Sequence, residues 1–211
     1  MMKKNILLIS VIVLFFLDLY FILSGCSKGI DSNVAIYFAT HNNIVLINIF
    51  KFISFICSPK FMILVNVCLF IFIILKKKYK LFLINVASIV SVIVNNIIKI
   101  IIKRERPNFL VLSNETSYSF PSGHSMISIL FFGSIIYLVN KYNIKYKKTI
   151  TILLSIFIIL VGLSRLYLGV HFLTDVIGGY LCGFIALIII IMIFERVGKK
   201  LKHLLQEHQV V

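Results

Sequence analysis

Long uninterrupted runs of apolar residues constrain this chain more strongly than any other feature of its sequence. A run of about 18 or more apolar residues is long enough to cross a bilayer as a helix. The chain has six candidate spans, at about residues 5–23, 61–75, 81–102, 122–140, 149–166 and 172–194. Hydrophobic residues make up 60% of the 211 positions, more than a soluble domain of this size can bury. The sequence therefore predicts an all-α, polytopic membrane protein with six transmembrane helices.

The basic residues predict how the chain is oriented in the membrane. Of the 22 Lys and Arg residues, 14 flank one set of span ends, including those within 76–80 and 141–148, and 8 flank the other set. The positive-inside rule places the first set, and with it both termini, in the cytoplasm. The net charge of +15 is therefore attributed to topology and to contact with anionic lipid headgroups. Because no helix presents a basic face with stacking aromatics, nucleic acid is not expected as a partner.

The connection between the first and second spans, residues 24–60, is too long for a simple loop. Its apolar residues between 34 and 55 predict an interfacial helical segment on the outer side of the membrane. Asp31 or Ser32 is the expected N-cap of a helix there. The second span is short as drawn, and we expect it to borrow residues from this connection.

The last residues of the sequence form a basic segment after the sixth predicted span. Residues 195–209 predict a short basic amphipathic helix on the cytoplasmic surface. With no repeat and no second domain evident, residues 1–211 are expected to form one domain, with a core at about 31–194 and a cytoplasmic basic tail at 195–211.

The N-terminal segment also resembles a bacterial lipoprotein signal. Two lysines precede an apolar stretch that ends in Leu23-Ser24-Gly25-Cys26, whose cysteine would carry the lipid. The stretch is long enough to span a membrane, however, and Asp18 interrupts its last part, so a retained first span is favoured. The four cysteines show no metal-ligand spacing, and a bridge between Cys26 and Cys57 is left open.

Three clusters of polar and charged residues fall on the predicted outer side of the membrane. They occupy residues 99–107 at the end of the third span, 121–124 at the start of the fourth, and 164–175 between the fifth and sixth. Each cluster alone has a structural explanation, such as a lysine that reaches the interface, a helix cap or a cation at a helix C-terminus. Their convergence on one side of one membrane favours a functional site instead.

Phosphoryl transfer accounts for this combination of residues. A phosphate ester needs several fixed positive charges, which Lys99, Arg106 and Arg165 supply. The helix start at Ser122 adds free backbone N–H groups, and Gly123 lets the backbone approach a phosphate closely.

Two histidines complete a possible reaction centre. His171 and Asp175 are four residues apart, so on a helix they share one face. A carboxylate there can accept from one ring nitrogen and leave the other as an unprotonated nucleophile. His124 can then donate a proton to the leaving oxygen. This set predicts hydrolysis through a phosphohistidine intermediate.

The three motifs Lys-x6-Arg-Pro, Pro-Ser-Gly-His and Ser-Arg-x5-His-x3-Asp resemble those of the type 2 phosphatidic acid phosphatase (PAP2) superfamily. The resemblance extends from about residue 31 to residue 194. It implies that His171 is the nucleophile, that Asp175 orients it and that His124 is the acid. The positions that the resemblance assigns to phosphate binding are Lys99, Arg106, Ser122, Gly123 and Arg165.

The resemblance also implies that no metal or other cofactor is needed. Glu105 and Glu115 are two separated loop acids, and we interpret them as solvated charges rather than as metal ligands. Residues 114–116 form an Asn-x-Thr sequon on the predicted outer side, whose use depends on the host cell.

The function expected from these observations is a lipid phosphatase or diphosphatase whose site opens at the outer face of the cell membrane. Undecaprenyl pyrophosphate is the favoured substrate, because that carrier is released on the outer face. Phosphatidylglycerol phosphate and phosphatidic acid are the alternatives. A non-catalytic lipid-phosphate binder or scrambler is a more distant alternative, which the presence of both histidines disfavours, and six apolar spans argue against a soluble haloperoxidase.

Overall fold

The computed structural model of the chain describes residues 2–109, 111–113 and 115–207. Asn114, the asparagine of the sequon, lies outside the described residues. The described residues contain eight α-helices and one short 3-10 helix: α1 (Met2–Leu23), α2 (Lys28–Thr40), α3 (Ile44–Ile56), α4 (Pro59–Lys76), η1 (Tyr79–Leu81), α5 (Phe82–Ile102), α6 (Gly123–Lys141), α7 (Lys147–Tyr167) and α8 (Leu173–Glu207).

Six segments within the described residues are long and apolar enough to cross a membrane. They are Lys3–Leu23, Pro59–Lys76, Tyr79–Ile102, Gly123–Lys141, Lys147–Tyr167 and Leu173–Lys200. The first five agree with the predicted spans to within a few residues, and the sixth ends six residues later than predicted, at Lys200. The second begins earlier than predicted because proline is well suited to the first turn of a helix. The predicted all-α, six-span fold is therefore confirmed.

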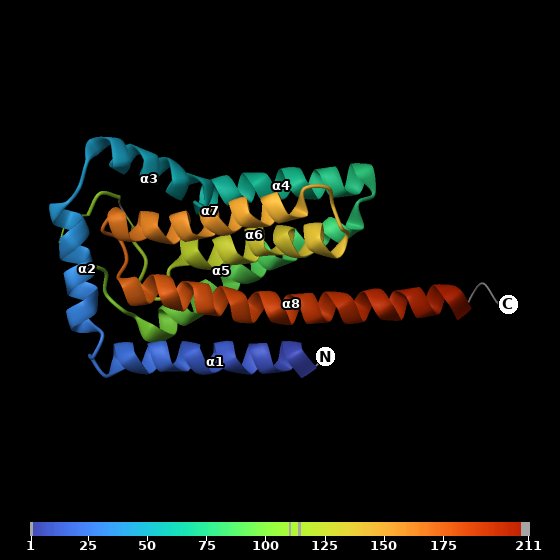
Figure 1. Ribbon diagram of the computed structural model, residues 1–211, viewed down its shortest axis with the longest axis horizontal. Helices are drawn as coiled ribbons and strands as arrows, with labels where there is room; N and C mark the ends of the chain where they lie inside the picture. The colour runs from blue at the N-terminus through green and yellow to red at the C-terminus, as the bar shows by residue number, and fades with distance from the viewer. Residues whose placement is uncertain (1, 110, 114, 208–211) are drawn as a thin grey trace.

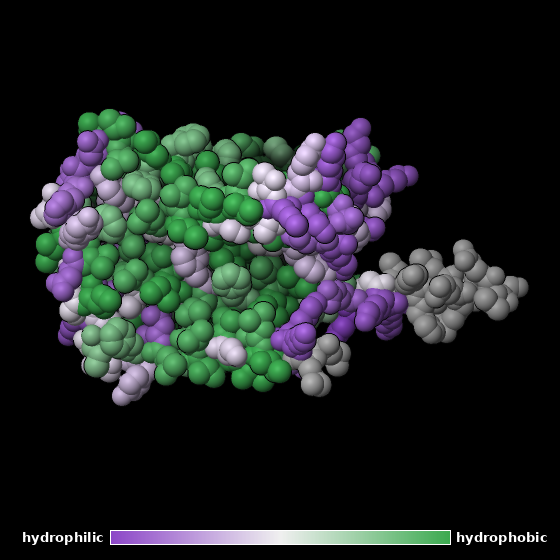
Figure 2. Space-filling model, viewed as in Figure 1, coloured by the Kyte–Doolittle hydropathy of each residue, from purple (hydrophilic) through white to green (hydrophobic). Residues whose placement is uncertain are grey.

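The helices form a bundle around α6, which packs against α5, α7 and α8 (Figure 1). The central core joins Ala87 of α5, Met126 and Leu130 of α6 and Leu187 of α8, all of them buried. Helix α1 packs against α8 at the edge of the bundle and leaves most of its apolar side chains exposed. Figure 2 shows a broad apolar surface with hydrophilic side chains gathered at both ends, as expected for a protein that spans a bilayer.

The connection between the first two spans is helical, as predicted, but its capping residue differs from the prediction. Helix α2 stands across one end of the bundle, and α3 packs against α7 (Figure 1). Helix α2 has Ser27 as its N-cap, which places Asp31 inside the first turn. The Asp31 side chain is 1% exposed and bonds to residues far away in the sequence, so it is unavailable for capping.

The predicted separate helix at 195–209 is wrong, because α8 continues without a break to Glu207. Only Gly198 weakens the helix there, at a cost of about 1 kcal/mol relative to alanine. Glu195 anchors this part of α8, since its carboxylate accepts from Lys4 Nζ at 2.6 Å and from Tyr137 Oη at 2.9 Å. Residues 208–211 lie outside the described residues.

The four cysteines are free thiols, with Cys57 buried and Cys26 exposed. The bridge between these two residues that the sequence left open is therefore absent from the structure.

Candidate active site

The structure brings the predicted site residues together at the end of the bundle that α2 covers. Lys99 lies in the last turn of α5 and Arg165 in the last turn of α7. Asp175 lies in the first turn of α8, and His171 lies in the short connection between α7 and α8. A cavity of about 340 Å³ is lined by five of the eight predicted residues, namely Lys99, Arg106, Gly123, His124 and His171.

The start of α6 is held close to α8. The Ser122 side chain caps the helix by accepting from Ser125 N, and Ser122 N donates to Asp175 O at 2.9 Å. A side chain at Gly179 of α8 would place its Cβ 2.6 Å from Ser122 O, so only glycine permits this close approach. The N-terminus of α6, with its free N–H groups, is therefore held beside the cavity.

Two of the predicted phosphate-binding cations contact the loop that follows α5. Lys99 Nζ donates to Ser117 Oγ at 3.1 Å. Arg106 donates from Nε to Ser117 O at 2.7 Å and from Nη1 to Val170 O at 2.6 Å. The same Nη1 lies 3.2 Å from His171 Nε2. Arg106 therefore positions a positive charge directly beside one ring nitrogen of His171.

The third cation, Arg165, is almost fully buried and pairs with Glu115. Its guanidinium donates from Nη2 to Glu115 Oε1 and from Nη1 to Ser54 Oγ. A second oxygen of Glu115 lies 3.9 Å from Arg106 Nη2. The interpretation of Glu115 as a solvated charge is wrong, because Glu115 pairs with the buried Arg165 and lies close to the partly buried Arg106, and so lowers the cost of burying these two cations. Among the described residues, no group of three or more His, Cys, Asp or Glu residues is placed to hold a metal ion.

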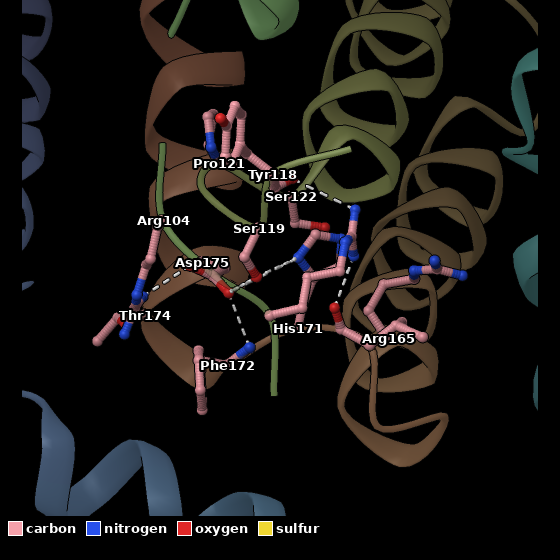
Figure 3. A network of polar contacts seen from close by, with 12 residues as sticks. Arg104, Tyr118, Ser119, Pro121, Ser122, Arg165, His171, Phe172, Thr174 and Asp175 are labelled. Carbon is pink, nitrogen blue, oxygen red and sulfur yellow. Dashed lines mark hydrogen bonds and ion pairs between the residues drawn. The ribbon is translucent and has the colours of Figure 1, made fainter. Parts of the chain in front are cut away.

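The contact between His171 and Asp175 differs from the predicted one. His171 precedes α8, so the two residues do not share a helical face. His171 Nδ1 lies 3.7 Å from Asp175 Oδ2, which is too far for a hydrogen bond. The Ser119 hydroxyl lies 3.3 Å from Nδ1 and donates to Oδ2 at 2.5 Å (Figure 3). Oδ2 also accepts from Phe172 N at 2.8 Å, which fixes the carboxylate at the start of α8.

His171 is buried, and its surroundings favour the uncharged form of the ring. Burial lowers the pKa of His171 well below its ordinary value, and the nearby cations Arg106 and Arg165 lower it further. The ring therefore holds a lone pair on one nitrogen at neutral pH, as nucleophilic attack requires.

A second set of residues around Asp175 was not found by the motif analysis. Arg104 Nη1 donates to Asp175 Oδ1 at 2.6 Å (Figure 3) and to Thr174 Oγ1 at 2.7 Å. Its Nη2 donates to Asp31 Oδ2 at 2.7 Å. Asp31 also accepts from Thr174 N at 3.1 Å. These bonds attach α2 to the start of α8 and hold Oδ1 of Asp175. In the sequence, Asp31 itself could have indicated these contacts, because a carboxylate at a membrane boundary needs a partner.

The fold and the site together define a polytopic membrane protein with a buried histidine close to several cations. The sequence profile of the PAP2 superfamily matches residues 80–199. The chain therefore belongs to the PAP2 superfamily, and the family predicted from the sequence is confirmed.

Two curated relatives are similar to parts of the chain. Phosphatidylglycerophosphatase B of Bacillus subtilis (strain 168) is 40% identical over 110 residues, which are 51% of this chain and 54% of that protein. The chain thus matches about half the length of this relative. An undecaprenyl-diphosphatase of Sulfolobus acidocaldarius is 29% identical over 191 residues, which are 86% of this chain and 88% of that protein.

Two solved structures share the fold. The crystal structure of a transmembrane PAP2 type phosphatidylglycerolphosphate phosphatase from Bacillus subtilis matches with a TM-score of 0.83 and 27% identity, over 90% of this chain and 96% of that chain. The crystal structure of Aquifex aeolicus LpxE matches with a TM-score of 0.64 and 23% identity, over 77% of this chain and 95% of that chain. At this level of identity the match shows a shared fold and nothing more.

Proposed function

We propose that this protein is a membrane lipid phosphatase that hydrolyses a lipid phosphate or pyrophosphate, with His171 as the nucleophile. The observation that carries the proposal is the composition of one cavity. Its lining combines two histidines and the cations Lys99 and Arg106 with apolar side chains, namely Met62 and Ile63 of α4 and Ile89 and Val92 of α5. A phosphate attached to an apolar chain suits both kinds of lining residue.

The chemical course follows from the arrangement of the two histidines. His171 Nε2 attacks the terminal phosphorus and a P–N bond forms. The P–O bond to the leaving oxygen breaks as His124 donates a proton to that oxygen, which is the lipid oxygen of a phosphate monoester or the bridging oxygen of a pyrophosphate. Lys99, Arg106 and Arg165 hold the phosphate oxygens, together with the N–H groups at the start of α6. His124 then takes a proton from water, which attacks phosphorus, and inorganic phosphate leaves His171. Arg165 exchanges its carboxylate partner for phosphate in this scheme.

Two substrates within the class are supported by the comparisons. Undecaprenyl pyrophosphate, the favoured prediction from the sequence, agrees with the name of the relative that matches 86% of this chain. Phosphatidylglycerol phosphate agrees with the names of the Bacillus subtilis relative and of the structural neighbour. Phosphatidic acid is the third member of the panel that a direct assay needs.

The proposed activity predicts phosphate release by the purified protein in detergent from at least one lipid phosphate or pyrophosphate in this panel. Because protein cations hold the charge, EDTA is expected to leave the rate largely unchanged. Vanadate is expected to inhibit, since it resembles five-coordinate phosphorus near the transition state. The control is His41→Ala, which removes an exposed histidine at the end of α2. No release from any member of the panel, or strict dependence on added Mg²⁺, contradicts the proposal.

We further propose that the cavity opens at the outer face of the membrane and that both termini are cytoplasmic. The N-terminus lies at the end of the bundle opposite α2 (Figure 1), and Lys4, near the start of α1, pairs with Glu195 of α8. The basic connections 76–80 and 141–148 support a cytoplasmic assignment for that end.

This orientation predicts a defined labelling pattern in intact cells. Because Asn42 lies in the exposed connection between α2 and α3, Asn42→Cys is expected to react with an impermeant thiol reagent. Ile144→Cys, in the exposed turn between α6 and α7, is the matched inner position and is expected to react only after the membrane is opened. The four native cysteines are replaced first. The reverse pattern would place the site in the cytoplasm.

A further inference from the structure

The hydroxyl of Ser119 occupies the space between the two residues that the motif pattern pairs. Ser119 lies in the connection between α5 and α6 and is fully buried. Its backbone N donates to Arg104 O at 2.8 Å, which fixes its position. Its Oγ lies 3.3 Å from His171 Nδ1 and 2.5 Å from Asp175 Oδ2, whereas Nδ1 and Oδ2 are 3.7 Å apart. Figure 3 shows Ser119 between the ring and the carboxylate.

Asp175, Ser119 and His171 form a series of hydrogen bonds, and the number of available protons determines the direction of each bond. An ionised carboxylate only accepts, and Asp175 is paired with Arg104 at 2.6 Å. The single hydroxyl proton of Ser119 is therefore directed at Asp175, which leaves a lone pair of Oγ facing His171. Nδ1 of the neutral ring consequently carries the proton and donates to Oγ.

This tautomer places the reactive lone pair on Nε2. Nε2 is the atom that lies 3.2 Å from Arg106 Nη1, on the side of the proposed phosphate site. Arg104, bound to Oδ1 of Asp175, keeps the other oxygen, Oδ2, turned toward Ser119.

We propose that Ser119 is a positioning residue through which Asp175 orients His171 and keeps its Nε2 unprotonated for attack. The inference rests on the proposed function, because it assigns a role within the phosphohistidine mechanism. When the P–N bond forms at Nε2, positive charge develops on the ring, and the chain from Nδ1–H through Oγ–H to Oδ2 strengthens. No proton leaves Nδ1 in this step. Ser119 touches neither phosphorus nor the leaving oxygen.

Kinetic coupling between Ser119 and Asp175 distinguishes an action of Asp175 on His171 through Ser119 from a direct contact between Asp175 and His171. Ser119→Ala is expected to lower kcat about 10- to 100-fold with little change in KM, since one buried hydrogen bond is lost. Asp175→Asn in the Ser119→Ala background is expected to add little to the effect of the more severe single variant, because the two residues act in series. The control is Ser128→Ala, a buried serine of α6 whose Oγ donates to Ser125 O. Fully multiplicative losses would show that Asp175 acts on His171 without Ser119.

Nitrogen NMR of ¹⁵N-histidine-labelled protein in detergent provides a readout that does not depend on activity. The His171 resonances are identified by their loss in His171→Ala. The wild type is expected to show the Nδ1–H tautomer, and Ser119→Ala is expected to show a shift toward protonation of Nε2. A wild-type ring protonated at Nε2, or an unchanged tautomer in Ser119→Ala, would overturn the role of Ser119. Failure of every lipid phosphate in the panel would instead overturn the proposed function, and the tautomer would still be decided by the spectra.

Discussion

Replacement of His171 by alanine is expected to abolish measurable turnover, with a loss of about 10⁴-fold or more. The ring provides the only proposed covalent acceptor for the phosphoryl group, and the remaining cations can still bind phosphate but cannot form the intermediate. The measurement is kcat for phosphate release by purified variant and wild type at equal protein concentration. Because His171 lies in a connection and not in a helix, the bundle is expected to remain folded.

The folded state of this variant is checked by its elution in size-exclusion chromatography and by its helical circular dichroism. His41→Ala serves again as the matched histidine control and is expected to retain the wild-type rate. Near-normal phosphate release by a folded His171→Ala variant would require a different nucleophile.

Replacement of His124 by alanine is expected to have the second-largest effect, a loss of about 10²- to 10⁴-fold on lipid phosphates. His124 is buried at the start of α6 and lines the cavity together with His171. With a lipid phosphate monoester, such as phosphatidic acid, the leaving group of the proposed first step is a lipid alkoxide, which is a poor leaving group and needs a proton from His124. An aryl phosphate that releases a stable phenolate needs no such proton.

Comparing the two types of substrate therefore distinguishes a role of His124 as proton donor from a role in binding phosphate. In the second step His124 acts as a base with either substrate, so steady-state rates would fall for both. The measurement is therefore restricted to the first turnover, in which the aryl phosphate releases a burst of phenolate. His124→Ala is expected to give a near-normal burst with the aryl phosphate and a much slower first turnover with a lipid phosphate. Equal losses in the first turnover with both substrates would indicate that His124 binds or positions phosphate instead.

Local sequence patterns were sufficient to predict the spans and the motif residues. Apolar runs define membrane helices because the bilayer requires a minimum length, so the six spans appeared without tertiary information. The motif residues were recognisable because phosphate chemistry needs cations and histidines, which are costly at a membrane boundary. The structure places five of the eight predicted site residues around one cavity.

The residues that the sequence did not predict act through contacts between distant segments. Asp31 bonds to Thr174, which is 143 positions further along the chain, and no local pattern distinguishes this role from helix capping. Arg104 and Ser119 lie close to motif positions, but their partners are defined only by how α2, α8 and the connection after α5 meet. The same holds for Glu115, which lies in the connection after α5, because its partner Arg165 lies in α7, 50 positions further along the chain.

Trapping the covalent intermediate tests the central claim most directly. Purified protein is mixed with a ³²P-labelled lipid phosphate and quenched within the first turnover, and the label is then mapped after proteolysis. Wild type is expected to carry alkali-stable, acid-labile label on the peptide that contains His171, and Ser119→Ala is expected to accumulate the same label more slowly. Rapid turnover by the wild type with no label on His171, or with label on another residue, would contradict the account.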